Sequence, residues 1–447
     1  MAPEDKQILE KYNTDLHAEN PARIIAVGVG GGGSNAVNYM FRQGVQHVAF
    51  AVVNTDRQAL ETSPVPNRLL IGPTTTKGLG AGNMPEIALA AGEESAAEIA
   101  DLFSDDMDMA FITAGMGGGT GTGAGPVVAR IAKEKGLLTI GIVTLPFMFE
   151  GIKKIKKAIS GAEEMSKYVD AIMIVNNERL IEIYPDLEME TAFAKADDIL
   201  STAASSIAEI ITLQGYINLD FNDVNTTLKN GSTAIISVGY GEGENRVANA
   251  IKDALNSPLL KNTDIMTSKR LLFNLYYSRT AGDRFKISEI KELTTFVRSV
   301  EQEVDVVWGI TYDESLGDKV KFTILASGFD VTIEDGRVIA PDTNNGNPKE
   351  GSNNMGTIRA LYGNEKIETM ERERETVNYI IIAPKDIDND TIIEEFEKQP
   401  TYQRNKRNKQ AITTTPPAAI ATPQSQPQGQ PQPTNEGGFN IMFGDDD

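Results

Sequence analysis

A run of glycines between Gly115 and Gly125 is the part of the sequence best suited to hold a phosphate group. Seven of these eleven residues are glycine and two are threonine. Glycine permits positive φ and close approach of a ligand to the backbone, and free N–H groups at a helix start attract anions. The run follows an apolar segment, 109–113, and precedes a helical pattern that starts at Val127, with Pro126 suited to its first turn. This order of strand, loop and helix predicts a phosphate-binding loop rather than a flexible linker.

A second glycine loop follows the apolar segment 24–28. Gly28, Gly30 and Gly33 satisfy the G-x-G-x-x-G fingerprint of dinucleotide-binding proteins, and Asp56 follows the next strand at a distance suited to a ribose contact. These residues alone support an NAD-dependent oxidoreductase. They leave the loop at Gly115 unexplained, however, and two such loops favour a nucleotide held by several loops at once. The sequence contains no G-x-x-x-x-G-K-[ST] motif, so a P-loop is excluded.

A third glycine-rich cluster spans 76–83 and precedes a predicted helix. It could close over a γ-phosphate, and it could equally be an ordinary glycine-rich turn.

Two carboxylates, Asp220 and Asp223, lie in the segment 218–223 at the start of another predicted helix. Acidic residues favour the first turn of a helix, so these residue types by themselves favour helix capping.

The elements around these loops alternate between apolar strands and amphipathic helices from Arg23 to Asn176, which predicts a parallel sheet covered on both faces. In such sheets ligands bind at the carboxyl ends of the strands, where the glycine loops lie. The predicted strands are 24–28, 47–53, 109–113, 137–143 and 171–175, and the predicted helices are 35–42, 85–103, 127–135 and 152–168.

A long helix is predicted over 191–213, with Gly215 as its stop, packed between two lobes. The second lobe, 219–331, has predicted strands at 232–239, 270–277, 304–311 and 319–327 and helices at 245–256 and 287–303. It carries no convincing nucleophile or metal cluster. From 336 the sequence becomes polar, and 413–438 is rich in Pro, Thr and Gln, which indicates unstructured chain.

Composition narrows the function classes. The 447 residues suffice for two or three domains, and without cysteine there is no disulfide or Cys-based zinc site. The only histidines are His17 and His47, and the net charge of −21 argues against non-specific nucleic-acid binding. No apolar run is long enough to span a membrane and the polar N-terminus does not resemble a secretion signal, so a cytoplasmic location is expected.

Several motifs in order resemble the tubulin superfamily. The G-G-G-T-G-T-G at 117–123 matches its signature, and the wider chain, about residues 22–330, is similar to the FtsZ family of bacterial cell-division GTPases. The other matching segments are 28–37, 54–56, 76–82, 146–151, 197–198 and 218–223.

This resemblance implies an α/β fold: a Rossmann-like parallel-sheet GTPase domain, a long central helix, a smaller α+β domain and a disordered C-terminal tail. The implied boundaries are an N-terminal extension at 1–21, a GTP-binding domain at 22–190, the central helix at 191–215, a GTPase-activating domain at 216–331, a flexible linker at 332–390 and a tail with partner-binding segments at 391–447.

The resemblance also implies roles for individual residues toward bound GTP or GDP. Gly31, Gly32, Gly33 and Ser34 would lie against the α- and β-phosphates, with Asn35 at the guanine and ribose. Gly119, Thr120 and Gly121, in one loop with Gly117, Gly118 and Thr122, would hold the β- and γ-phosphates. Glu150, with Lys154, would contact the ribose, Phe193 would stack on the base, and Asp197 and Asp198 would bind its edge. Core packing for Phe193 and a surface charge for Asp198 are the alternative interpretations.

The chain departs from the family pattern at three places. Lys153 and Lys154 stand where arginine is usual, and a lysine lacks the bidentate fork of arginine. Asp197 stands where asparagine is usual, and the usual D-I-P-x-F-L end motif is not recognisable. Guanine preference should survive these changes.

Under the resemblance, Asn218, Asp220 and Asp223 belong to a loop that one subunit inserts into the nucleotide site of the next. The two carboxylates would orient the attacking water, with Mg²⁺ bridging phosphate oxygens and no protein-only metal site. Head-to-tail contacts of this kind produce open filaments. A GTP-binding scaffold without turnover is the second alternative, and the acidic pair argues against it.

The resemblance finally implies a location at the mid-cell division site and indirect membrane contact, through membrane-anchoring and regulatory division proteins. An amphipathic segment at 392–404, a basic stretch at 404–409 and the terminal 439–443 are the candidate docking segments for these partners.

Overall fold

The computed structural model of the chain describes residues 23–45, 47–184, 186, 188–256, 268–282, 285–300, 304–329, 358–359, 361–364 and 366–369. All of them belong to the first of two units, residues 1–370. The predicted N-terminal extension at 1–21, the tail at 391–447 and helical residues 301–303 lie outside the described residues.

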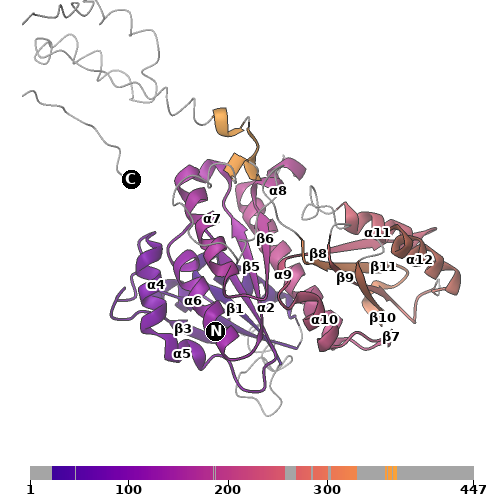
Figure 1. The fold of residues 1–447 in the computed structure, drawn as a ribbon, viewed down its shortest axis with the longest axis horizontal. Coiled ribbons are helices and arrows are strands. Elements are labelled where there is room, and N and C mark those ends of the chain that lie inside the picture. Colours follow the sequence, from indigo (N-terminus) through magenta and orange to yellow (C-terminus); the bar gives the residue numbers. More distant parts are fainter. Residues whose placement is uncertain are drawn as a thin grey trace, which may run out of the picture. The chain divides into compact units, whose positions relative to one another are not determined.

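The first lobe is built on a parallel sheet (Figure 1). Apart from the edge strand β3, its strands are buried along almost their whole length, as expected for a sheet covered on both faces. In chain order they are β1 (Ile24–Val29), β2 (Val48–Asn54), β3 (Asn67–Leu70), β4 (Met109–Gly115), β5 (Leu138–Leu145) and β6 (Ala171–Asn176). They are arranged in the order β3-β2-β1-β4-β5-β6, so β1 and β4 are neighbours at the centre, in the register Val29 to Ala114.

The helices of this lobe are α2 (Gly30–Gln43), α3 (Arg57–Glu61), α4 (Pro85–Glu94), α5 (Ala96–Ala100), α6 (Thr120–Glu134), α7 (Ile152–Ser166) and α8 (Glu178–Ile183), with the short η1 (Met148–Glu150). Apolar residues of α2 pack in one core and those of α6 in the other, so these two helices leave β1 and β4 toward opposite faces of the sheet. The connection order therefore reverses between β1 and β4, which is where open α/β sheets bind ligands.

A long helix, α9 (Met189–Thr212), connects the two lobes. Its residues Ala196, Leu200, Ala203 and Ile207 are buried in a core that includes strands of both lobes. The buried ammonium of Lys321 also pairs with Glu209 of this helix at 2.5 Å. The prediction of a central helix is confirmed.

The second lobe contains β7 (Gly215–Ile217), β8 (Ser232–Gly241), β9 (Arg270–Tyr277), β10 (Asp305–Tyr312) and β11 (Val320–Ser327). They are arranged as β8-β11-β9-β10-β7, and only β9 and β10 pair in parallel among them. The helical elements are α10 (Phe221–Leu228), α11 (Arg246–Leu255), η3 (Ile287–Glu289), α12 (Ile290–Ser299) and η4 (Glu314–Leu316). Pairing of Ala171 with Ser232 joins the two sheets.

Four sequence predictions of helix ends are wrong. Helices α2 and α6 begin at Gly30 and Thr120, inside the glycine runs, rather than at 35 and 127. Pro126 therefore lies inside α6 rather than in its first turn. The predicted helix 85–103 is two helices separated at Ser95, and Gly215 lies in β7 while α9 ends in an extended Leu213.

Part of the predicted linker 332–390 is packed structure. Ile358 and Ile367 are fully buried and Tyr362 is nearly so, against side chains of η1 and α7. A flexible linker is therefore the wrong description for the described residues between Ile358 and Thr369. Within the described part of the chain, no helix combines the length and apolar character needed to cross a membrane.

Candidate active site

Two helices begin side by side at the carboxyl ends of β1 and β4, and both leave their first N–H groups without side-chain partners. Neither α2 nor α6 has a side-chain cap or an acidic residue in its first turn. A Cβ built on Gly30 would lie 2.7 Å from the amide nitrogen of Gly121, so the two ends are in contact. The unpaired N–H groups and the positive ends of two helix dipoles form an anion-binding site at this edge.

The glycines of this edge fall into two classes. A Cβ on Gly33 would lie 2.2 Å from the carbonyl oxygen of Thr113, and one on Gly123 would lie 2.0 Å from that of Pro85, so backbone packing excludes any side chain there. A Cβ on Gly31 or on Gly118 would meet no protein atom within 4 Å, and neither glycine has a positive φ. Packing gives no reason for glycine at these two positions, and close approach of a ligand does.

Hydroxyl groups lie at the same edge. Ser34 is buried in α2 and its Oγ makes no hydrogen bond to any described residue, which suits a phosphate oxygen as its missing partner. The Oγ1 atoms of Thr120 and Thr55 are 2.7 Å apart. The sequence analysis did not assign Thr55 to the site, although the segment 54–56 matched a family motif.

Thr122 has a structural role inside the loop, whether or not it also contacts a phosphate. Its Oγ1 accepts a hydrogen bond of 2.8 Å from the Gly117 N–H inside the loop. Thr122 and the Gly117 amide therefore hold the loop closed, and the Gly117 N–H already has a partner inside the loop.

The third glycine cluster lies against the second. A Cβ on Gly119 would lie 3.0 Å from the Ala81 side chain and 3.2 Å from the Met84 nitrogen. Gly78, Gly80 and Gly82 all have positive φ, which accounts for glycine in this turn. The segment 76–83 therefore borders the anion site, and the structure leaves both interpretations of it open.

The segment 146–151 closes another side of the site. Glu150 accepts a hydrogen bond of 2.8 Å from the Phe147 N–H and forms an ion pair with Lys154. A Cβ on Gly117 would lie 2.8 Å from Cγ of Lys154, so this lysine packs beside the phosphate loop, while Lys153 is exposed. Of the two lysines that stand where the family usually has arginine, Lys154 rather than Lys153 therefore lies beside the phosphate loop.

Two of the predicted base-binding residues share a face of α9, four residues apart. Phe193 is 38 % exposed, and its ring contacts that of Phe147 at a centroid distance of 5.0 Å. Asp197 makes no hydrogen bond or ion pair with the described residues, and burial raises its pKa to about 7. Asp198 lies to the side, where it accepts from Tyr39 Oη at 3.1 Å and from Lys195 Nζ at 2.7 Å. Asp197 rather than Asp198 is therefore free for a ligand, and Asn35 is exposed in α2.

The predicted catalytic loop lies at the other end of α9. Asp220 and Asp223 form a capping box at the start of α10: each carboxylate accepts from the backbone N–H of the other, at 3.0 and 2.9 Å. Asn218 Oδ1 accepts from Gly215 N–H at 2.6 Å. Capping, the interpretation favoured by the residues alone, is thus part of their role.

These three residues are far from the anion site of their own chain. From Asp197 to Thr212 the axis of α9 advances by about 22 Å at 1.5 Å per residue, and Asn218 follows after β7. The loop is exposed at Asn218 and Asp220. The structure does not bring the acidic pair together with the glycine loops in one chain.

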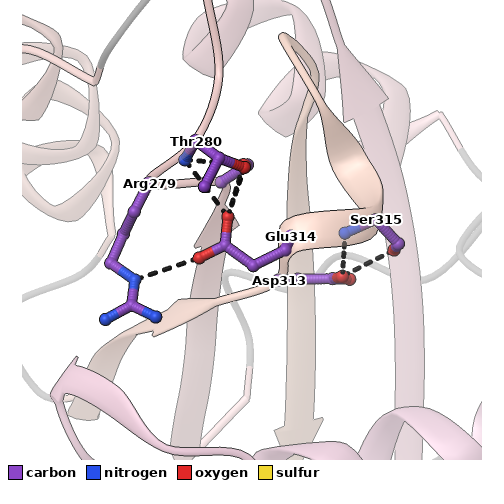
Figure 2. A network of polar contacts seen from close by, with 6 residues as sticks. Arg279, Thr280, Asp313, Glu314 and Ser315 are labelled. Carbon is purple, nitrogen blue, oxygen red and sulfur yellow. Dashed lines mark hydrogen bonds and ion pairs between the residues drawn. The ribbon is translucent and has the colours of Figure 1, made fainter.

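A polar network stiffens the lobe next to this loop (Figure 2). Glu314 accepts from Ser278, Arg279 and Thr280 at 2.7 to 3.1 Å, and these hydrogen bonds lower its pKa to about 2. The neighbouring Tyr312 N–H donates to Gln214, directly before β7. The exposed loop therefore stands on an ordered end of the second lobe.

The structure weakens the dinucleotide alternative. The Asp56 Oδ1 accepts from the N–H groups of Gln58 and Ala59 and caps α3, so the position of this carboxylate is explained without a bound ribose.

Comparison with known proteins agrees with this geometry. Residues 23–185 match the model of the tubulin/FtsZ family GTPase domain, and residues 232–330 match the FtsZ family C-terminal domain. A "Cell division protein FtsZ" from Porphyromonas gingivalis is 47% identical over 403 residues, covering 86% of each chain.

Solved structures show the same fold. A structure titled "FtsZ dimer, empty" from M. jannaschii matches with a TM-score of 0.65 and 37% identity over 78% of this chain and 100% of its own. A CetZ2 protofilament of Haloferax volcanii with bound GTPγS matches with a TM-score of 0.60 over 78% of this chain and 99% of its own; at 19% identity it supports the fold alone. The chain matches two family domains in order and is 47% identical to a curated relative over most of both chains, in agreement with the anion site at the two helix starts. This chain therefore belongs to the FtsZ family of tubulin-like GTPases.

Proposed function

We propose that this GTPase polymerises head-to-tail in bacterial cell division and hydrolyses GTP at the contact between two subunits. One subunit contributes the glycine loops and the bound nucleotide. The next contributes Asn218, Asp220 and Asp223. The separation of these two groups along α9 is the observation that carries the proposal.

In the nucleotide half, the N–H groups at the starts of α2 and α6 bind the phosphates, with Ser34 and Thr120 as hydroxyl donors. Gly31 and Gly118 leave room for phosphate oxygens, as their open surroundings support. Lys154 and Glu150 lie toward the ribose, Phe193 packs on the base, and Asp197 accepts hydrogen bonds from the guanine edge. Mg²⁺ bound to the phosphate oxygens neutralises their charge when it is present.

In the second half, the carboxylates of Asp220 and Asp223 orient a water molecule for in-line attack on the γ-phosphorus. The bond from that phosphorus to the bridging oxygen breaks, leaving GDP and phosphate. Such transfer needs positioning and charge stabilisation more than covalent chemistry from the protein. The reciprocal capping of the two residues holds both carboxylates in a defined place before a subunit docks.

The proposal predicts that GTP turnover per subunit rises steeply with protein concentration and then levels off, because isolated chains have incomplete sites. Turnover and pelleting are measured on the same samples across the transition. Turnover per subunit that is independent of concentration would contradict hydrolysis between subunits.

A pH-dependent prediction follows from Asp197. When it is ionised, this carboxylate can accept hydrogen bonds from both N1–H and N2–H of guanine. Burial favours its protonated form, so the carboxyl group must lose its proton before the base can bind in this way. With a pKa of about 7 in the free protein, lowering the pH from 8 to 6 should weaken GDP binding by about tenfold.

Asp197→Asn should remove this component and leave only the pH dependence of the phosphates. Calorimetry in two buffers should detect more proton release on GDP binding in the wild type than in Asp197→Asn. In the nucleotide-free protein, the pKa of Asp197 is about 7 in the folded state and about 4 in the unfolded state. Its protonation therefore stabilises the fold fully below about pH 4, and this contribution is lost as the pH rises through about 7. Equal pH slopes in the two proteins would exclude a role of Asp197 at the base.

We also propose that the segments after residue 390 bind membrane-anchoring and regulatory division proteins, so that filaments gather at mid-cell. Deleting 391–447 should leave GTPase activity and filaments intact and abolish partner binding.

A further inference from the structure

After the second lobe, the chain packs on the outside of the segment that borders the nucleotide site. The described residues between Ile358 and Thr369, which we call the C-terminal strap, include the buried side chains of Ile358, Tyr362 and Ile367. They form one apolar cluster with Met148 of η1 and with Ile155 and Ile159 of α7. In Figure 1 the strap is the short orange stretch beside α7 and α8.

Hydrogen bonds tie the strap to the same segment. Tyr362 Oη donates to the carbonyl oxygen of Pro146 at 2.7 Å in a buried contact, and Asn176 Nδ2 donates to the Leu361 carbonyl at 3.0 Å.

Glu178 bridges the strap and η1. One of its carboxylate oxygens accepts from the Met148 N–H at 2.9 Å, and the other accepts from Lys366 Nζ at 2.9 Å. Glu178 is only 6% exposed, so without Lys366 a buried charge would lose its ion-pair partner. The backbone of 146–148 is therefore held at the Pro146 carbonyl by the strap itself and at the Met148 N–H by a carboxylate that the strap neutralises.

The inner side of the same short segment faces the site. Phe147 contacts Phe193, and Glu150 pairs with Lys154 beside the phosphate loop. Burial, with the charges of Glu178 and Glu150, raises the pKa of Tyr362, which keeps its hydroxyl protonated as a donor. Gly151, which follows η1, has φ +94°, and its carbonyl accepts from the Ile155 N–H of α7 at 3.2 Å, so this end of the segment continues into the helix on which the strap packs.

We propose that the C-terminal strap is a positioning element of the nucleotide site: Tyr362 and Lys366 hold 146–151 in place from outside and so slow nucleotide release. The inference rests on the proposed assignment of Glu150 and Lys154 to the nucleotide. It makes release depend on a segment that precedes the proposed partner-binding tail.

The test uses the full chain loaded with tritiated GDP and chased with unlabelled GDP. Tyr362→Phe removes one hydrogen bond and should speed release by about two- to tenfold. Tyr362→Phe combined with Lys366→Met should speed release further. Lys366→Arg alone should release GDP at the wild-type rate because it keeps the pair with Glu178. Tyr240→Phe, an exposed position of β8, is the matched control and should release GDP at the wild-type rate.

Hydrogen exchange of 146–151 is measured on the same proteins and should rise in the double variant. The double variant could exchange faster at 146–151 and still release GDP at the wild-type rate, and this result would show that the strap only stabilises the fold. If its exchange is unchanged, these contacts do not hold the segment. Failure of the wild type to bind GDP at all would instead overturn the proposed function on which the inference rests.

Discussion

Asp223→Asn should bind GTP as tightly as the wild type and lose GTP turnover by about a hundredfold or more. Asparagine keeps a side-chain oxygen that can accept the Asp220 N–H, so the capping box survives. The substitution removes only the negative charge, which in our proposal orients the attacking water in the neighbouring site. Turnover is measured above the assembly concentration, together with GTP binding and the free energy of unfolding.

Two further variants separate capping from catalysis. Asp223→Ala should lose the same activity and also about 1 kcal/mol of stability, because it breaks the cap. Asp253→Asn removes a similar charge from α11, where the carboxylate only accepts from the Tyr240 N–H, and should hydrolyse GTP normally. If Asp223→Asn retains normal turnover, the acidic pair is a helix cap and nothing more.

Gly31→Ala and Gly118→Ala should each weaken GTP binding by about tenfold to a hundredfold while leaving the fold intact. Each new methyl group points into space that contains no protein atom within 4 Å, so it meets the nucleotide and nothing else. Alanine is also the better helix former at Gly31, inside α2. Binding is measured by equilibrium titration with GDP and stability by denaturant unfolding.

Gly33→Ala and Gly123→Ala are the matched controls, because their methyl groups would strike backbone carbonyls at 2.2 and 2.0 Å. These variants should lose about 1–3 kcal/mol of stability or more. If Gly31→Ala and Gly118→Ala bind GDP normally, the open space beside them does not hold the phosphates.

The parallel sheet could be predicted well from the sequence because each strand is a continuous apolar run. Every predicted strand is present with ends within two residues, whereas β3 was missed because its sequence, Asn-Arg-Leu-Leu, is short and half polar. The starts of α2 and α6 were placed five to seven residues late, because glycine has a low helix propensity. At Gly30, Gly33, Gly121 and Gly123 the opposing backbone leaves no room for a side chain, which local propensity does not register.

The site could be predicted only in part, because pairing between distant elements decides what each side chain is free to do. The sequence placed Asp197 and Asp198 together at the base, yet Tyr39 of α2 and Lys195 engage only Asp198. The sequence assigned Thr122 to phosphate and did not show that its hydroxyl also accepts from the Gly117 N–H. The strap was assigned to a linker because its few apolar residues are scattered among polar ones and show little periodicity. Its burial depends on the surface of α7, which the local sequence does not reveal.

The most direct test of hydrolysis between subunits is complementation of two inactive proteins. Asp223→Asn binds GTP but lacks the catalytic carboxylate, and Gly31→Ala/Gly118→Ala has the acidic pair but binds GTP poorly. At a GTP concentration that fills only the first, each alone should be nearly inactive. An equal mixture should recover up to about a quarter of wild-type turnover per chain, since half of the chains hold GTP and half of their neighbours carry an intact loop. A mixture no more active than the sum of its parts would contradict a site completed by the next subunit.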